Sequence, residues 1–531
     1  MPGAPSSDQD QVRTAEVIAS LCLATDLGIG LPFEHGLHST LFAMRLAEHL
    51  GVDDETASQT YYGCLLFYIG CTADADITAE LFDEGALLTH FQPVMFASPA
   101  QTTAGIMRAL AGSGSAAGRA ITVARRLPRA VRDHRHHTAA LCEVAQMLSD
   151  RLGLPSSMRD MFAYFTDRWD GKGQPSGRSR EAIPVALRIV HVARDAALQR
   201  LLGGVEYAAT VVRERAGGAF DPAIAARLAD GADEILALPD GTPAWDEVLD
   251  SEPGRWSMLR GIEIDRALAA MGDFADLASP YLVGHSTGVA DLAGDAAACC
   301  GFPDDEVVAV RRAALVHDVG RVAVPAHVWQ KAAPLTPDEW EHVRLHAYHS
   351  ERVLSRSPFL AALSPVATFH HEHLDGSGYH RGVTAAALSP AARLLAAADA
   401  YHALTEPRAH RAALPPERAA ETVEREVEAG RLDAHSAEAV LEAAGQRSRN
   451  IRRPAGLTAR EAEVVGLLAR GRQTKQIART LGVSPKTADR HIQNAYAKIG
   501  VSTRAAATLF AMEHGLAAWG ELPMDRARGR S

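Results

Sequence analysis

Histidines and aspartates of the kind that bind transition metals recur between residues 285 and 399 of this 531-residue chain. A His-Asp pair ends one apolar run, a His-His pair precedes a glutamate, and an aspartate ends the apolar run RLLAAAD. Neutral imidazoles and carboxylates suit Fe, Mn or Zn better than Mg²⁺ or Ca²⁺, which prefer shells of oxygen alone. The candidate ligands are His285, His317, Asp318, His346, His370, His371 and Asp399.

The adjacent pair His317-Asp318 indicates what such a site can do. One carboxylate can bridge two metal ions while neighbouring histidines complete the shell of each ion. A water between two such ions becomes a hydroxide nucleophile near neutral pH, which suits in-line attack on a phosphodiester. A single histidine is more often an ordinary surface or core residue, but seven ligand-type residues in one stretch favour a metal site.

Five segments match, in order, the motifs of HD-GYP domains: HDVGR, PLTPDEW, HAYHS, HHEHLDGSGYH and AAADAYHAL. The resemblance covers roughly residues 275–445. HD-GYP domains are all-helical metallo-phosphodiesterases of cyclic di-GMP and related cyclic dinucleotides. The resemblance implies that the seven residues bind two divalent ions, Fe or Mn, with Asp318 as the bridging ligand. It also implies a role for Arg321 beside the substrate phosphate and a substrate loop that contains Asp375, Gly376, Gly378 and Tyr379.

Four positions depart from the HD-GYP pattern. Arg321 stands in place of a lysine, which keeps the positive charge but changes its geometry. His380 replaces the proline of GYP, and His402 replaces the second aspartate of the D-x-x-D-A motif. Tyr281 occupies the position where some members carry an additional glutamate ligand, so the sequence predicts two metals and not three.

Helical periodicity recurs almost everywhere in the chain, and the same helical pattern occurs twice. DRWDGKGQPSG (167–177) resembles EHLDGSGYHRG (372–382), and residues 50–71 match residues 300–321. In the first copy the ligand pairs become Phe67-Tyr68 and Phe165-Thr166, and Arg194 replaces the last aspartate. His35 alone keeps a ligand position, so we expect this copy to be degenerate and to serve packing, dimerisation or ligand sensing.

The C-terminal segment predicts a helix-turn-helix. Thr458 and Glu461 form a capping box at the start of a first helix, and a short helix follows at 474–481. After the turn Gly482-Val483-Ser484, Pro485 suits the first position of a helix that runs to Ile499. Short helices joined by a tight glycine-containing turn are typical of DNA-binding domains.

This segment resembles the LuxR-type (NarL-like) domain of four helices, through LT-x-RE, IA, S-x-KT and KIGV over about sixty residues. The resemblance implies that Lys486, Thr487, Arg490 and Gln493 enter the major groove and that Lys475, Ser484 and Lys498 contact phosphates. The helix at 503–514 is where this family usually dimerises, which implies a homodimer on a two-fold related DNA site.

The charge distribution agrees with a DNA-binding end. From Ile451 onward the chain has 14 Lys/Arg and 6 Asp/Glu, which is a net charge of +8. Because the whole chain has a net charge of −11, the first 450 residues have a net charge of −19. A basic module on an acidic body is typical of nucleic-acid binding. Hydrophobic residues make up 47% of the chain and aromatic residues 6%, a composition that favours helices.

The sequence therefore predicts an all-α chain with two tandem HD-type helical modules, the first degenerate, and a four-helix LuxR/NarL-like domain. The expected boundaries are 10–235 for the degenerate module, 236–270 for a linker, 271–446 for the HD-GYP domain, 447–455 for a linker and 456–518 for the DNA-binding domain. Six cysteines without a CxxC pair, no signal peptide and no membrane span indicate a cytoplasmic protein.

The predicted function is a regulator that hydrolyses cyclic di-GMP or a related cyclic dinucleotide and binds promoter DNA. Two alternatives stay open. The metal site can be catalytically silent, in a transcription factor that senses a nucleotide, or the HD site can hydrolyse another phosphorylated nucleotide. The complete ligand set favours an enzyme over a pure binder, whereas Arg321, His380 and His402 bear on the choice of substrate.

Overall fold

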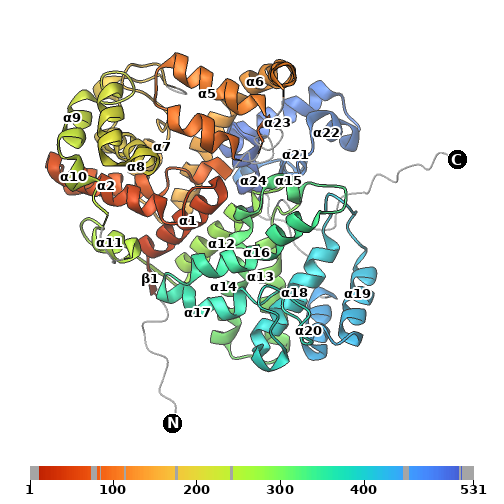
Figure 1. The fold of residues 1–531 in the computed structure, drawn as a ribbon. Coiled ribbons are helices and arrows are strands. Elements are labelled where there is room, and N and C mark those ends of the chain that lie inside the picture. Colours follow the sequence, from red (N-terminus) through yellow and green to blue (C-terminus); the bar gives the residue numbers. More distant parts are fainter. Residues whose placement is uncertain are drawn as a thin grey trace, which may run out of the picture.

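A computed structural model describes residues 11–72, 81–83, 85–112, 115–173, 177–238, 243–445, 454–513 and 516. Among these residues the chain is built from helices, and the two short strands β1 (Gln11–Arg13) and β2 (Met258–Arg260) form one antiparallel pair (Figure 1). The prediction of an all-α fold is confirmed. No helix within these ranges has the length and apolar character needed to span a membrane.

The first helical module follows β1. Its main helices are α1 (Thr14–Ile29), α2 (His35–Leu50), α3 (Asp54–Leu65), α5 (Pro99–Ala111), α6 (Ala116–Arg151), α7 (Ser156–Phe162), α8 (Val185–Arg215) and α9 (Pro222–Asp230). Short turns of helix lie between them: η1 (Ile69–Thr72), η2 (Leu87–Phe91), η3 (Gln92–Val94), η4 (Arg180–Ala182) and α10 (Ala232–Ile235). α6 is a long helix that reaches the other parts of the chain.

The second module repeats this order. Its elements are α12 (Ile262–Asp276), α13 (His285–Cys299), α14 (Asp304–Val316), η5 (Val319–Ala323), α15 (Ala326–Trp329), α16 (Pro337–Leu354), α17 (Pro358–Ala367), η6 (Ala385–Ala387), α18 (Pro390–Thr405), α19 (Pro416–Glu428) and α20 (Ala434–Gly445). α2 and α13 occupy corresponding positions, and each begins with a histidine after a residue in the left-handed region, Glu34 (φ 75°) and Gly284 (φ 78°).

The segment 236–270, predicted as a linker, contains ordered elements. It forms α11 (Ala244–Asp250), β2 and the first turns of α12, and Trp245 and Val248 of α11 are buried in the core. The abundance of Pro, Gly and Asp suggested irregular chain, but the two apolar side chains anchor a short helix against α2. Most of the second predicted linker, 447–455, lies outside the described residues.

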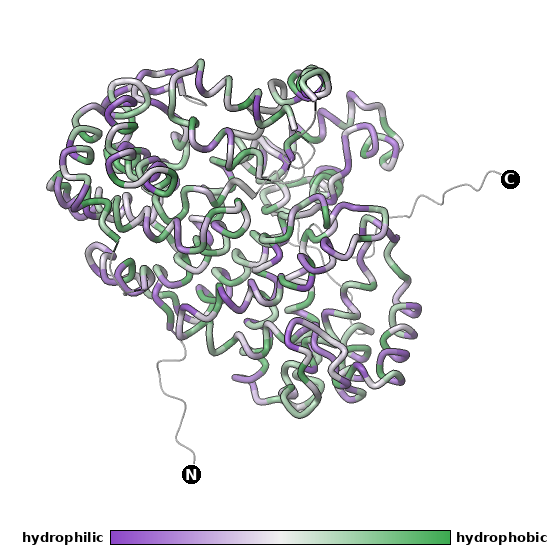
Figure 2. Tube along the Cα trace, in the orientation of Figure 1, coloured by the Kyte–Doolittle hydropathy of each residue, from purple (hydrophilic) through white to green (hydrophobic). Residues whose placement is uncertain are grey.

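The two modules pack against each other over a continuous apolar core, which includes Ile18 and Phe42 from the first and Phe274 and Val316 from the second. Hydrophilic and hydrophobic stretches alternate along most helices (Figure 2), as expected for helices that bury one face. A buried ion pair of 2.7 Å joins Arg151 at the end of α6 to Asp273 of α12.

The C-terminal domain has a 3-10 turn η7 (Pro454–Gly456) and four helices, α21 (Ala459–Ala469), α22 (Thr474–Leu481), α23 (Pro485–Ile499) and α24 (Arg504–Glu513). The predicted capping box is present, since Thr458 accepts from Glu461 N while the Glu461 carboxylate accepts from Thr458 N. Ile477, Leu481 and Ile492 form part of its own small core. The domain lies beside α6 in Figure 1.

Candidate functional site

Three buried histidines of the second module are oriented in the same way. In each, Nδ1 donates a hydrogen bond to the backbone carbonyl three residues earlier, at 2.6 Å for His317 and 2.7 Å for His370, and His346 makes the same contact. His285 instead donates from Nδ1 to the carboxylate of Glu406 at 2.8 Å. In all four rings Nδ1 is therefore the hydrogen-bonded atom, which leaves Nε2 as the atom available to ligate a metal.

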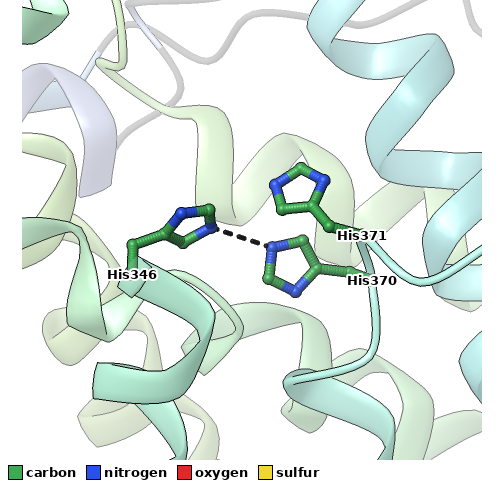
Figure 3. Close-up of side chains that lie close together, drawn as sticks. All are labelled: His346, His370 and His371. Carbon is green, nitrogen blue, oxygen red and sulfur yellow. Dashed lines mark hydrogen bonds between the residues drawn. The ribbon is translucent and has the colours of Figure 1, made fainter. Parts of the chain in front are cut away.

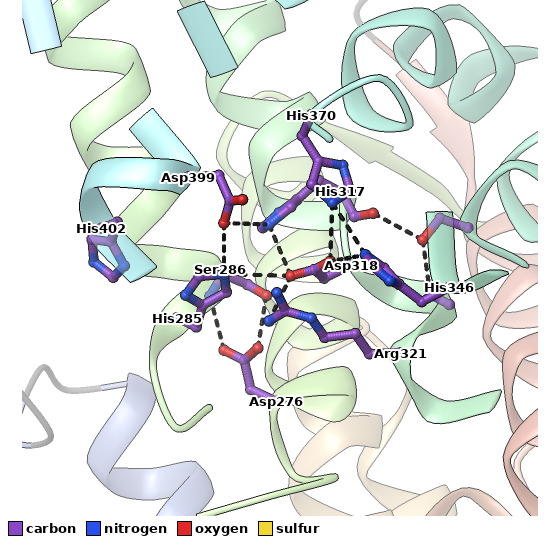
Figure 4. A network of polar contacts seen from close by, with 12 residues as sticks. Asp276, His285, Ser286, His317, Asp318, Arg321, His346, His370, Asp399 and His402 are labelled. Atoms are coloured by element: carbon purple, nitrogen blue, oxygen red, sulfur yellow. Dashed lines mark hydrogen bonds and ion pairs between the residues drawn. The ribbon is translucent and has the colours of Figure 1, made fainter. Parts of the chain in front are cut away.

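The carboxylate of Asp318 lies among these four Nε2 atoms (Figure 4). Its Oδ1 atom lies 3.2 Å from Nε2 of His346 and 3.4 Å from Nε2 of His370. Its Oδ2 atom lies 2.9 Å from Nε2 of His317 and 3.4 Å from Nε2 of His285. One carboxylate thus presents one oxygen to each of two histidine pairs, as a bridging ligand must.

Among the described residues, four groups of candidate ligand atoms each lie within 4.8 Å: His346, His370 and His371; His285, His317 and Asp399; His317, Asp318 and His370; and His285, His402 and Glu406. The first two groups contain six of the seven predicted ligands. Figure 3 shows the first group, in which the Nε2 atoms of His346 and His370 are 3.3 Å apart. The structure therefore brings together all seven residues predicted as ligands, from α13, α16, α18 and the segments that follow α14 and α17.

The donor set of this cluster fits two cations. The Nε2 atoms and carboxylate oxygens can all act as metal ligands, and they face one another in a buried space at whose edge the guanidinium of Arg321 pairs with Asp318. Burial lowers the pKa of His370, and it lowers the pKa of His371 well below the usual range. Burial also opposes charge on His317, yet the Asp318 carboxylate raises the pKa of this histidine to about 9, so the pocket favours positive charge.

Arg321 lies at the edge of the cluster. Its guanidinium is buried and pairs with Oδ2 of Asp318 at 2.6 Å, and it lies 5.5 Å from the ring of Trp329. The 3-10 turn η5 that follows the His-Asp pair places this side chain one turn after Asp318. A fixed positive charge here can meet an anionic group that approaches the metals.

The predicted substrate loop lies against the first histidine group. Gly376 has φ 80°, a conformation that favours glycine, and Asp375 accepts a hydrogen bond from Ser377 N at 2.9 Å. A Cβ atom on Gly378 would lie 2.4 Å from the carbonyl oxygen of His371, so only glycine fits there. The ring of Tyr379 lies 4.7 Å from that of His371.

An open cavity of about 470 Å³ lies beside this loop. Its lining includes Tyr379, His380, Arg381 and, from α16, Arg344. His380, which replaces the proline of the GYP motif, is held by Glu351 at 3.2 Å. The cavity therefore combines two arginines, which pair with Glu341 and Glu351, with an aromatic ring that lies against a metal-ligand candidate.

Two carboxylates near the site had no role in the sequence prediction. Glu406 contacts His285, as described, and although burial opposes ionisation, His285 and Arg408 lower its pKa to about 2. Asp276 accepts from Ser286 N and Oγ, both at 2.9 Å, and burial raises its pKa to about 7. Neither carboxylate could be found from a short sequence motif, because each contacts a residue that belongs to another helix.

The first module has the same arrangement without the ligands. Arg194, in the position of Asp399, is buried with its guanidinium 4.1 Å from the ring of Tyr68 and 5.2 Å from that of Phe67. These rings stand where the second module has its His-Asp pair. Burial, followed by the charge of Arg194, lowers the pKa of His35 to about 3. A guanidinium and two aromatic rings fill the space in which cations would lie.

Replacing His35 with alanine is therefore expected to leave the metal content of the chain unchanged. His285→Ala, the matched change at the start of α13, is expected to lower that content by about half, because one of the two ligand groups loses a member. Elemental analysis of the purified variants after dialysis against Mn²⁺ checks both. Loss of metal from the His35 variant would show that the first module also binds metal.

The side chains predicted to bind DNA lie on α22, on α23 and in the turn between them. Lys486, Arg490 and Gln493 are exposed on one side of α23, whose buried side carries Ala488 and Ile492. The remaining candidates differ in their surroundings: Lys475 is exposed, Thr487 is half-buried, Ser484 caps α23 by accepting from Thr487 N, and Lys498 pairs with Glu461 at 2.6 Å.

α24, predicted as the dimerisation helix over 503–514, runs from Arg504 to Glu513, and His514 lies outside the described residues. Its first turn is bound by Glu143 of α6: the carboxylate accepts from the backbone N–H of Ser502 at 2.8 Å and of Thr503 at 2.9 Å, and from both hydroxyl groups. Leu509 of α24 is fully buried. The DNA-binding domain thus docks on the first module through this helix.

Glu143→Ala is expected to loosen this docking. Hydrogen bonds to a charged group contribute about 1.5–3 kcal/mol each, so amide hydrogen exchange in α24 should accelerate by at least about tenfold. Exchange measured by mass spectrometry on the full chain checks this, with Glu206→Ala on the exposed face of α8 as control. Equal protection of α24 in both variants would mean that Glu143 contributes nothing to the docking.

Two family models match the chain. The model described as "HD domain" matches residues 270–435, and the model described as "Bacterial regulatory proteins, luxR family" matches residues 455–511. The first range contains all seven candidate ligands, and the second contains the helix-turn-helix. Both assignments agree with the resemblances found in the sequence.

Similar sequences match this chain over different lengths. The 3′3′-cGAMP-specific phosphodiesterase 3 of Vibrio cholerae is 27% identical over 77% of this chain and 90% of its own length. The cyclic di-GMP phosphodiesterase of Thermotoga maritima is 33% identical over 26% of this chain and 39% of its own length.

A crystal structure of a cyclic GMP-AMP specific phosphodiesterase from V. cholerae superimposes with a TM-score of 0.57 at 22% identity, over 82% of this chain and 99% of that one. This likeness shows that the tandem helical fold is shared. The family matches give the chain an HD domain at residues 270–435 and a LuxR-family regulatory domain at residues 455–511, and its sequence relatives include cyclic-dinucleotide phosphodiesterases.

Proposed function

We propose that the chain is a metal-dependent phosphodiesterase of cyclic dinucleotides that also binds promoter DNA. The observation that carries this proposal is the position of Asp318, whose two carboxylate oxygens face two separate groups of histidines. The relatives named for their action on 3′3′-cGAMP and cyclic di-GMP support this class of substrate. Cyclic dinucleotides and promoter DNA both occur in the cytoplasm, which is therefore the proposed location.

The site would hold two divalent ions, with Fe and Mn as the candidates. His285, His317 and Asp399 would hold one ion, and His346, His370 and His371 the other. Bound ions of this kind polarise a phosphoryl oxygen and lower the pKa of water to near neutrality. Hydrolysis adds the OH of water to phosphorus, breaks one P–O bond of the ring and leaves the remaining proton on the departing ribose oxygen.

The side chains around the cluster would bind and orient the nucleotide. Arg321 brings a permanent positive charge to the side of the cluster where Asp318 lies, and it would contact a non-bridging phosphate oxygen. The glycine loop holds Tyr379 between the His371 ring and the cavity, where a base or ribose can pack against it. Arg344 and Arg381 on the rim would attract the second phosphate.

The LuxR-family domain would give the chain its second activity. Two copies of the domain, related by two-fold symmetry, would place α23 in successive major grooves. Because α24 docks on α6, and α6 is joined to the second module through Arg151, a nucleotide that favours one arrangement of these elements would change how α23 is presented.

Turnover of a small set of nucleotides tests the enzymatic part of this proposal. The chain is loaded with Mn²⁺ and incubated separately with cyclic di-GMP, 3′3′-cGAMP and dGTP, and the products are separated by chromatography. We expect linear dinucleotides from at least one cyclic substrate and no hydrolysis of dGTP. Hydrolysis of dGTP alone would support the alternative of an HD phosphohydrolase that acts on another nucleotide.

A further inference from the structure

Among the four described histidines whose Nε2 atoms face Asp318, His285 is the one whose Nδ1 atom contacts a side chain from a distant element. In His317, His346 and His370, Nδ1 donates to the carbonyl three residues earlier. His285 is the first residue of α13, and the carbonyl three residues before it, in Leu282, already accepts from the backbone N–H of His285 at 2.9 Å. Nδ1 of its imidazole contacts a side-chain acceptor instead.

Glu406 supplies that acceptor. It directly follows α18, is 3% exposed, and its Oε2 atom accepts from Nδ1 of His285 at 2.8 Å. The same oxygen accepts from the guanidinium of Arg408 at 2.8 Å, and Arg408 also donates to the carbonyl of Tyr281 at 3.2 Å. The carboxylate is thus fixed between the end of α18 and the segment that leads into α13.

The residue one turn earlier explains why Glu406 is needed. His402 stands where the HD-GYP motif has an aspartate, and its buried ring lies 5.4 Å from the ring of His285. Gly288 makes room for this ring, since a Cβ atom there would lie 2.0 Å from Nε2 of His402. Position 402 therefore offers an imidazole where the motif has a carboxylate, and the carboxylate comes from the next turn.

We propose that Glu406 is a positioning residue of the metal centre, which takes over in this chain the role left vacant by the aspartate-to-histidine change at position 402. It accepts the hydrogen of Nδ1 of His285 and so turns Nε2 of this ring toward Asp399 and Asp318, 3.1 and 3.4 Å away. Its charge also strengthens His285 as a donor to a cation. This inference rests on the proposed metal centre but not on its substrate.

The test measures Mn²⁺ affinity of the full chain by competition with a chelator, without nucleotide. Glu406→Ala is expected to raise the Kd for Mn²⁺ about 10- to 100-fold, the usual effect of losing such a partner. Glu406→Gln is expected to have a smaller effect, because its amide oxygen still accepts from Nδ1 but carries no charge. The double variant His402→Asp/Glu406→Ala returns a carboxylate to position 402 and is expected to recover most of the affinity.

Glu417→Ala on the exposed start of α19 is the matched control, and the circular dichroism of each metal-free variant establishes its folding. A folded Glu406→Ala variant with unchanged Mn²⁺ affinity would overturn the inference, and so would a double variant that binds no better than the single one. If Glu406→Ala does not fold, Glu406→Gln takes its place, and an unchanged Mn²⁺ affinity of this variant would overturn the inference. Absence of turnover by wild-type protein that binds Mn²⁺ contradicts the proposed function but leaves these affinities interpretable.

Discussion

Replacing Asp318 with asparagine is expected to remove both metal binding and turnover. The two oxygens of this carboxylate face His317 at 2.9 Å and His346 at 3.2 Å, and the amide nitrogen of asparagine cannot ligate a cation. Because a bound metal stabilises the transition state by several kcal/mol, kcat/KM should fall by at least about three orders of magnitude, or about 4 kcal/mol. Metal content and hydrolysis of cyclic dinucleotides, measured on the same preparation, check this expectation.

Asp305→Asn, on the exposed first turn of α14, is the matched control for this change. It removes the same charge from the helix that leads to the His-Asp pair, and it should leave both measurements unchanged. Full turnover by the Asp318 variant would show that hydrolysis takes place at another site. Full metal content without turnover would limit the role of Asp318 to the chemical step.

Replacing Lys486 and Arg490 together with alanine is expected to weaken DNA binding about 100-fold. Both side chains are exposed on one side of α23, and a side chain that contacts bases or phosphates contributes about 1–3 kcal/mol. If both contact phosphates, the slope of log K against log salt should become shallower by about 2. Titration of a promoter fragment at several salt concentrations measures affinity and slope together.

Arg418→Ala on α19 provides a control that also removes a positive charge, because this arginine lies exposed on the second module, outside the DNA-binding domain. It should change neither affinity nor slope. Binding by the Lys486/Arg490 variant at wild-type strength and with the wild-type slope would place the DNA on another surface of the chain.

The elements that could be predicted from the sequence are those specified by local signals. The helices Thr474–Leu481 and Pro485–Ile499 have the predicted bounds, because a glycine in the turn and a proline at the first helical position mark their ends. The metal-ligand candidates were found for a related reason. Each belongs to a short motif, such as the His317-Asp318 pair, whose residue types are informative before any contact is known.

Contacts between distant segments could not be predicted in this way. Glu406 meets His285 across 121 positions, and Glu143 meets Thr503 across 360, so neither glutamate stands out from the many solvated ones. The segment 236–270, predicted as a linker, shows the opposite case, because it contains the helix α11. Its Pro and Gly residues are conspicuous, whereas the burial of Trp245 depends on helices that lie far away in the sequence.

The degenerate module shows how much can be predicted by aligning the two copies of the repeat. Alignment of the two copies places Arg194 opposite Asp399, and charge alone indicates that this position no longer binds metal. The structure adds what the arginine does instead, since its guanidinium stacks over Tyr68 at 4.1 Å inside the core. A pairwise alignment identifies the change, but the packing that accommodates a buried guanidinium appears only in three dimensions.

The central claim is that the His/Asp cluster around Asp318 is a two-metal centre that hydrolyses cyclic dinucleotides. Its most direct test is to add Mn²⁺ stepwise to metal-free protein and to follow cleavage of cyclic di-GMP and of 3′3′-cGAMP at each step. We predict that turnover rises with metal occupancy and saturates when both ligand groups are filled. We also predict that it disappears when a chelator removes the metal. Turnover that persists in metal-free protein, or no turnover of either substrate by fully loaded protein, would contradict it.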